Sequence, residues 1–107
     1  MPEPRPPRLT QQSLLVLKLF ADHVNDSLAG TDVMKCARLS SGTLYPILLR
    51  FEQSGLLESR WEEEEPRNLG RPRRRLYTVT TKGAAVCRAA LKELLGARLP
   101  YPIPKVV

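Results

Sequence analysis

Apolar residues recur with helical spacing in four segments of the chain, and between the third and fourth segments they alternate with polar residues. This pattern predicts four helices and two strands. The helices are expected at about 10–25, 32–38, 41–54 and 81–97, and the strands at about 56–65 and 73–79. Thr10, Ser40 and Thr80 stand where N-caps are needed, and Gly55 stands where a left-handed C-cap ends the third helix. The chain is therefore expected to be mainly α-helical, with one small β-hairpin.

The first helix is apolar on more than one side, which is typical of a helix that is covered from two directions. Its apolar residues are Leu14, Leu15, Val16, Leu17, Leu19, Phe20, Ala21 and Val24. In so small a domain the second covering surface usually belongs to another subunit. The last helix is expected to turn Cys87, Leu91, Leu94 and Leu95 inward. We therefore predict a homodimer whose interface residues are Leu15, Leu19, Phe20, Leu91, Leu94 and Leu95.

Only Leu39 and Ser40 separate the second and third helices, which follow a loop at 25–31 with Thr31 as candidate cap. Two helices joined by so tight a turn predict a helix-turn-helix, a unit common in DNA-binding proteins. The inward side of the third helix is expected to carry Leu44, Ile47, Leu48 and Phe51. Its outward side carries Gly42, Thr43, Pro46, Leu49, Arg50 and Gln53, with Tyr45 at the border. Small residues at the start and hydrogen-bonding residues beyond suit a helix that enters the major groove.

Charge points to the same partner. The 107 residues are enough for one domain, and the net charge of +6 with a pI near 9.8 favours a polyanion. Five arginines and no acid lie in the segment 66–75, between the two predicted strands. Arginine binds phosphate through a planar fork of donors. A long basic loop beside a recognition helix predicts a winged helix-turn-helix that binds duplex DNA.

The predicted DNA-binding residues fall in two groups, on the third helix and in the loop. They are Ser41, Gly42, Thr43, Tyr45, Pro46, Arg50, Gln53, Arg71, Arg73, Arg74 and Arg75. Two alternatives stay open: Tyr45 can be a half-buried packing residue, and the glutamates at 62–65 can pair with the arginines across the hairpin. Such pairing is compatible with DNA binding, because phosphates can compete for the same arginines.

Catalytic and metal chemistry find little support. His23 is the only histidine, with no second histidine to complete a metal site and no serine partner for a dyad. Cys36 and Cys87 are expected to be small buried residues. We therefore predict neither a cofactor nor an enzyme activity from the histidine and the cysteines. No apolar run is long enough to span a bilayer, and we expect a cytoplasmic protein without a membrane partner. A small-molecule effector stays open, because the sequence identifies neither the effector nor its site.

Two blocks of the chain resemble the PadR-like winged-helix transcriptional regulators. One is Leu39-Ser40-Ser41-Gly42-Thr43-Leu44-Tyr45-Pro46, and the other runs from Gly70-Arg71-Pro72 to Leu76-Tyr77-Thr78-Val79-Thr80-Thr81-Lys82-Gly83. The resemblance covers roughly residues 12–95. It implies a homodimeric repressor on a palindromic operator, with the helix 41–54 in the major groove and the wing (60–77) along the backbone. The prolines at both ends predict a flexible arm at 1–8 and a proline-rich tail at 100–107. Between them we expect a DNA-binding domain at 9–80 and a dimerisation helix at 81–99.

The chain departs from the family pattern at two positions and in its length, because it ends soon after one C-terminal helix and so resembles the short subgroup. Arg38 replaces a turn residue that is usually glycine-like, and Leu49 stands where a basic residue is common. The only tryptophan, Trp61, lies on the first strand of the wing rather than on the last helix, so drug sensing between subunits is not supported. Two other functions stay open, namely a winged-helix module that binds proteins and an architectural DNA binder without sequence preference.

Overall fold

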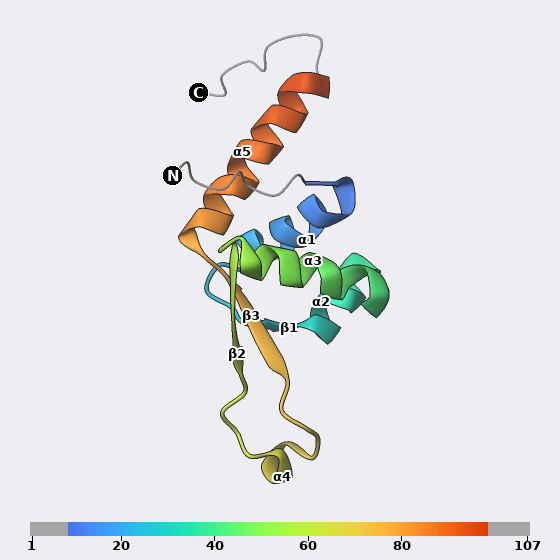
Figure 1. Ribbon diagram of the computed structural model, residues 1–107, viewed down its shortest axis with the longest axis vertical. Coiled ribbons are helices and arrows are strands. Elements are labelled where there is room, and N and C mark those ends of the chain that lie inside the picture. Colours follow the sequence, from blue (N-terminus) through green and yellow to red (C-terminus); the bar gives the residue numbers. More distant parts are fainter. Residues whose placement is uncertain (1–8, 99–107) are drawn as a thin grey trace.

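The computed structural model describes residues 9–98, and the predicted arm and tail lie outside them. The elements are α1 (Gln11–Asp22), β1 (Leu28–Ala29), α2 (Gly30–Ala37), α3 (Ser41–Gln53), β2 (Leu57–Trp61), α4 (Pro66–Leu69), β3 (Arg75–Val79) and α5 (Thr81–Arg98). Figure 1 shows α5 running away from the body at one end and the β2–β3 hairpin projecting at the other. This confirms the mainly α-helical winged helix-turn-helix.

Hydrogen bonds at Thr10 explain why α1 begins where the sequence predicts. The Thr10 hydroxyl accepts from the Ser13 amide at 3.1 Å, and the Ser13 hydroxyl accepts from the Thr10 amide at 2.7 Å. This reciprocal capping satisfies two amides that have no partner within the helix. The helix ends at Asp22, before the expected end at Asn25, because the backbone leaves helical geometry at His23.

The start of α2 corrects the predicted cap. The helix begins at Gly30, and the Asp32 carboxylate accepts a hydrogen bond from the Ala29 amide at 3.0 Å. Thr31 therefore lies inside the first turn and is not the cap. At the other end Arg38 has φ = 55°, a left-handed conformation that favours glycine. Arg38 therefore occupies a left-handed backbone position that glycine adopts more easily.

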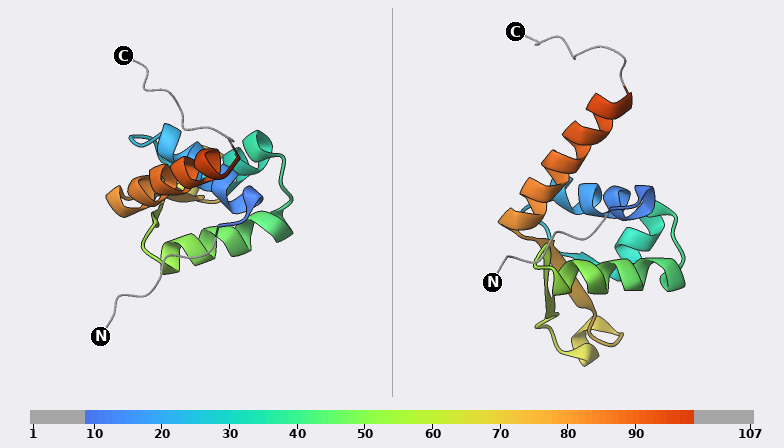
Figure 2. Two further views of the ribbon diagram at one scale, coloured as in Figure 1. Left: turned by 90° about the horizontal axis from the view of Figure 1, so that it is seen from above. Right: turned by 45° about the horizontal axis from the view of Figure 1, so that its top comes forward.

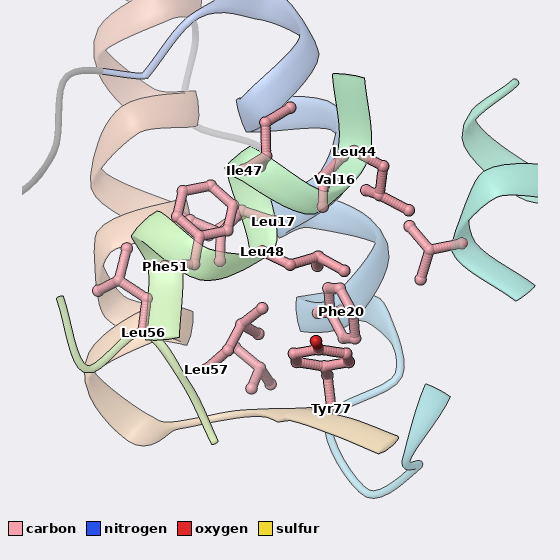
Figure 3. Close-up of a cluster of buried hydrophobic side chains, with 13 residues drawn as sticks. Val16, Leu17, Phe20, Leu44, Ile47, Leu48, Phe51, Leu56, Leu57 and Tyr77 are labelled. Atoms are coloured by element: carbon pink, nitrogen blue, oxygen red, sulfur yellow. The ribbon is translucent and has the colours of Figure 1, made fainter. Parts of the chain in front are cut away.

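The inward side of α3 is the centre of the core, as predicted. Leu44, Ile47, Leu48 and Phe51 are all buried. Figure 3 shows them meeting Val16, Leu17 and Phe20 of α1, with Tyr77 of β3 beneath. Burying a leucine or phenylalanine side chain stabilises the fold by about 1.5–3 kcal/mol, so this side of α3 is held firmly against the body. The opposite side is then the one left to solvent.

The sheet has three strands in the order β1-β3-β2, with both pairs antiparallel. Leu57 lies opposite Val79, and Trp61 lies opposite Arg75. Both strands of the hairpin are shorter than predicted, and β1 lies in the segment expected to be a loop. The connection between β2 and β3 also contains the one-turn helix α4, which the periodicity does not predict.

Thr80 and Gly83 join α5 to the rest of the fold. The Thr80 hydroxyl accepts from the Gly83 amide at 2.9 Å and donates to the Gly55 carbonyl at 2.7 Å, which confirms the predicted cap. Cys87 is buried as expected, but Cys36 is exposed, so that half of the cysteine prediction is wrong. Within residues 9–98 no helix is long and apolar enough to cross a membrane.

Candidate nucleic-acid interface

The outward side of α3 is open to solvent. Ser41, Gly42, Pro46, Arg50 and Gln53 are exposed, and Thr43 is half-buried. Leu49, at 57% exposure, lies among them. Ser40 stands at the N-cap position, but its hydroxyl accepts no hydrogen bond from a backbone amide and instead donates to the Thr43 hydroxyl at 3.2 Å. Six of the seven predicted helix contacts thus lie on a polar surface, and the seventh is Tyr45.

Tyr45 has both of the roles that the sequence left open. Its side chain is 44% exposed, yet its ring packs on Gly30 so closely that a Cβ there would lie 2.7 Å from the Tyr45 hydroxyl oxygen. Tyr45 also lines a shallow depression with residues from α2 and from the base of the wing. The other lining residues are Ala29, Gly30, Thr31, Arg74, Arg75 and Tyr77. The first half of α3 and the base of the wing therefore share one surface.

Glu62 is the centre of the ion pairs inside the wing. Its carboxylate accepts from Arg71 Nη1 at 2.5 Å and Nη2 at 3.1 Å, and from the Arg74 amide at 2.8 Å. The hydrogen bonds from Arg71 hold the pKa of Glu62 at about 2, against the opposite effect of burial. This charged carboxylate precedes α4, and the arginines that it binds follow α4, so the contacts tie the two ends of the loop together.

Arg73, Arg74 and Arg75 each have an acidic partner. Arg73 Nη2 lies 3.1 Å from Glu65 Oε1, and its Nε donates to the Glu64 carbonyl oxygen at 3.0 Å. Arg74 Nη1 lies 3.8 Å from Asp32 Oδ1 on α2. Arg75 Nη2 donates to Glu52 Oε2 on α3 at 3.0 Å. The four predicted wing arginines are thus paired within the chain. Arg71, Arg73 and Arg74 pair with the glutamates at 62–65, as in the alternative, whereas Arg75 pairs with Glu52 outside that run.

Where both partners are exposed, such pairing leaves the arginine available to a stronger partner. Ion pairs between exposed side chains contribute about 0–1 kcal/mol, because water screens them and both side chains lose freedom. Arg73 and its partner Glu65 have side chains 39% and 71% exposed, so this pair is among the easiest to displace. A phosphate group can replace the carboxylate, because it also accepts two parallel, charge-assisted hydrogen bonds from one guanidinium.

Sequence reasoning missed the residues that organise the wing. Pro66 stands at the first position of α4 and Gly70, with φ = 67°, at its C-cap. Proline at the start and glycine after the end are a helix signal, so α4 was readable in the sequence. It places Arg67 at the far end of the wing, exposed and without an ion pair among the described residues. The roles of Glu52 and Asp32 as partners of arginine follow only from the fold.

The residues predicted for the subunit interface differ in how far the single chain leaves them exposed. Leu15 is 50% exposed and Leu95 49% exposed, although Leu95 was expected to point inward. Leu19 and Leu91 are half-buried against the core, and Leu94 is half-buried. Phe20 is fully buried, with its ring centre 6.5 Å from that of Tyr77, so its prediction as an interface residue is wrong. Its side of α1 belongs to the core.

Among residues 9–98 no three histidine, cysteine, aspartate or glutamate side chains gather closely enough to hold a metal ion. His23 is exposed and lies 3.4 Å from the Asp26 carboxylate, three residues further along the chain. That contact is local to the turn after α1, and it does not involve α3 or the wing.

Comparison with known proteins gives a family and a fold. The sequence profile of the transcriptional regulator PadR-like family matches residues 28–89. A PadR family transcriptional regulator from Eggerthella lenta superposes with a TM-score of 0.65 at 23% identity, over 80% of this chain and 76% of that one. Staphylococcus aureus MepR in a DNA complex gives 0.66 at 19% identity, over 83% and 67%. No curated protein sequence matches the chain.

The protein smu.1704 from Streptococcus mutans has a similar fold, with a TM-score of 0.60 at 24% identity over 84% of this chain and 94% of that one. At such identities the likeness concerns the fold alone. The family profile includes β1, α2, α3, the wing and the first half of α5, and these are the elements that carry the candidate interface.

Proposed function

The chain belongs to the PadR-like family of transcriptional regulators, and on that premise we propose that it binds a palindromic operator as a homodimer and represses transcription. In this proposal α3 enters the major groove, and the wing contacts the phosphate backbone beside it. The observation that carries the proposal is the shared surface of Tyr45 with Arg74 and Arg75, which joins the outward side of α3 to the base of the wing.

The helix supplies the groups that read bases. Thr43, Arg50 and Gln53 offer hydroxyl, guanidinium and amide groups, and Arg and Gln are common partners of guanine and adenine edges. Ser41 lies at the helix N-terminus, where free backbone amides attract a phosphate. The exposed Leu49 suits contact with a thymine methyl group.

The wing supplies charge. Arg67 at the far end and Arg73 in its exposed pair with Glu65 are the arginines that a phosphate reaches with least competition. Each phosphate contact releases counterions from the duplex, so affinity is expected to fall steeply as salt rises.

The dimer would follow from the apolar residues of α1 and α5 that the core leaves uncovered. Leu15 and Leu95 are half exposed in the isolated chain, and Leu94 is half-buried. Figure 2 shows the outer part of α5 standing clear of the body, so a twin copy can pack along it. A two-fold dimer presents two copies of α3, and a two-fold operator is the sequence that fits them.

Selection of bound duplexes from a random pool tests this function. Recovery of a palindromic sequence is expected, because each subunit reads one half-site. Binding of every duplex with similar affinity would instead identify an architectural protein. If no duplex binds in a salt-dependent way, the exposed Leu49 favours the second candidate, a module that docks on another protein.

A further inference from the structure

Arg75, at the start of β3, joins three elements through one side chain. Its Nε donates to the Ser59 hydroxyl of β2 at 2.9 Å, and its Nη2 donates to Glu52 Oε2 of α3 at 3.0 Å. Its guanidinium carbon lies 5.7 Å from the centre of the Trp61 ring, within cation–π range. The Ser59 hydroxyl donates to the same Glu52 oxygen. We call Glu52, Ser59, Trp61 and Arg75 the wing clamp.

The wing clamp sits where the hairpin leaves the body. Trp61 and Arg75 are the outermost paired residues of β2 and β3, and both are exposed. The nearest buried residues on the two strands are Leu57 and Tyr77, further in. Beyond that point the hairpin has no core beneath it, so side chains must fix its direction. Glu52, in the last turn of α3, is the anchor on the helix.

The surroundings of Arg75 do not suit a phosphate ligand. Two of its nitrogens are already bonded, and a carboxylate beside it repels a phosphate. Hydrogen bonding from Ser59, and then from Arg75, lowers the pKa of Glu52, so this carboxylate is charged at neutral pH. Glu52 is the less exposed partner, at 30% against 43% for the Arg75 side chain. Arg75 therefore directs its guanidinium at Glu52 of α3, although its side chain remains partly exposed.

We propose that the wing clamp sets the direction of the wing relative to α3, and that Arg75 is a positioning residue rather than a phosphate contact. This inference rests on the proposed function, in which α3 and the wing touch one duplex. The chain from Trp61 to Pro66 can reach at most roughly 15 Å, so a tilt of about 10° at its base moves the far end by up to about 3 Å. That shift equals the length of a hydrogen bond, enough to take Arg67 and Arg73 off their phosphates.

The number of phosphate contacts separates the two roles of Arg75. Affinity is measured as a function of salt for Arg75→Met and for Arg73→Met, with a mixed-sequence duplex and with the duplex enriched by selection. Arg73→Met is expected to reduce the slope of log affinity against log salt by about one, because it removes a phosphate contact. Arg75→Met is expected to weaken binding by about tenfold and to reduce the slope by about two, because Arg67 and Arg73 both lose their phosphates when the wing tilts. Unchanged affinity, or a slope reduced by one, would overturn the proposal.

A charge swap gives a second, independent test. Arg75→Glu alone places a negative charge near the duplex and breaks the pair with Glu52. Adding Glu52→Arg restores an opposite-charge pair across the same gap, so most of the lost affinity is expected to return. A phosphate contact at position 75 would not be rescued in this way, and a double variant no better than Arg75→Glu would rule out the clamp.

The direction of the wing in the free protein distinguishes failure of this inference from failure of the proposed function. Residual dipolar couplings of the amides in β2, β3 and α3 measure the angle between wing and helix without DNA. A changed angle in Arg75→Met supports the wing clamp, and an identical angle rejects it. If wild-type protein binds neither duplex, the proposed function fails, whereas the angle still decides whether the clamp exists.

Discussion

At the scale of single residues, Gly83 is the glycine that leaves the least space for a side chain. A Cβ atom there would lie 2.2 Å from the Leu56 carbonyl oxygen and 2.9 Å from Val79 Cγ2, and both belong to the packed body of the protein. The Thr80 and Gly83 positions of the family block thus have a physical reason, since α5 must begin directly against the turn that follows α3. The sequence pattern showed these residues but not the contact that requires them.

We expect Gly83→Ala to destabilise the protein by about 2–4 kcal/mol, because backbone must shift to admit the methyl group. Urea denaturation followed by circular dichroism measures the change. Gly96→Ala is the matched control: its Cβ meets nothing within 4 Å, and alanine in a helix is expected to add roughly 0.5–1 kcal/mol. Equal stability of the two variants would contradict the contact at Gly83.

Glu62 gives a prediction in pH. Its pKa in the folded protein is about 2, below the ordinary 4.5, so its ion pairs stabilise the wing above pH 4.5. That contribution is lost as pH falls from 4.5 through 2 and the carboxylate becomes protonated. The amide resonance of Arg74, which donates to Glu62, is expected to titrate near the lower value. Glu62→Gln should abolish that titration, and a midpoint at 4.5 would contradict the pairing.

At the scale of elements, the parts that could be predicted are those that local rules determine. The inward side of α3 follows from helical periodicity, and Thr10, Gly55 and Thr80 act as caps through contacts within a few residues or across one turn. β1 could not be found this way, because two residues form a strand only when β3 lies beside them. The start of α2 shifted for a local reason, because the Asp32 carboxylate accepts from the Ala29 amide three residues earlier.

The one-turn helix α4 places Arg67 at the far end of the wing, where it is expected to contact phosphates. We expect Arg67→Ala to weaken binding to all duplexes alike and to reduce the salt slope by about one, because Arg67 is exposed and its charge serves phosphates. Electrophoretic mobility shifts at several salt concentrations measure both effects. Arg88→Ala is the control, an exposed arginine on α5 that is outside the proposed interface. A loss confined to one sequence would assign Arg67 to base reading instead.

At the scale of the whole molecule, the proposed dimer is the least predictable feature, because a partner surface leaves no trace in one chain except uncovered apolar residues. Phe20 shows the difficulty: it belongs to the same apolar pattern as Leu15, yet it is fully buried while Leu15 is half exposed. Periodicity distinguishes apolar from polar sides, but it does not say which apolar side meets the core. The candidate DNA surface was easier to predict from the sequence, because its residues are both polar or charged and exposed.

We expect wild-type protein to scatter light with about twice the 12.1 kDa mass of one chain, and Leu95→Asp to return it to one chain, because a buried charge opposes association. Operator affinity should fall with it, since each subunit then binds its half-site alone. Val24→Asp is the control, a residue of 50% exposure that is not in the predicted interface. A monomeric wild type would remove the two-fold operator from the proposal.

Trp61 has a practical consequence. It is the only tryptophan in the protein, it is 58% exposed, and it is the last residue of β2, opposite Arg75. Its fluorescence therefore comes from a single, known corner of the molecule and needs no attached dye. Titration of the unmodified protein with a duplex would follow, through one natural chromophore, the arrival of a ligand at this corner.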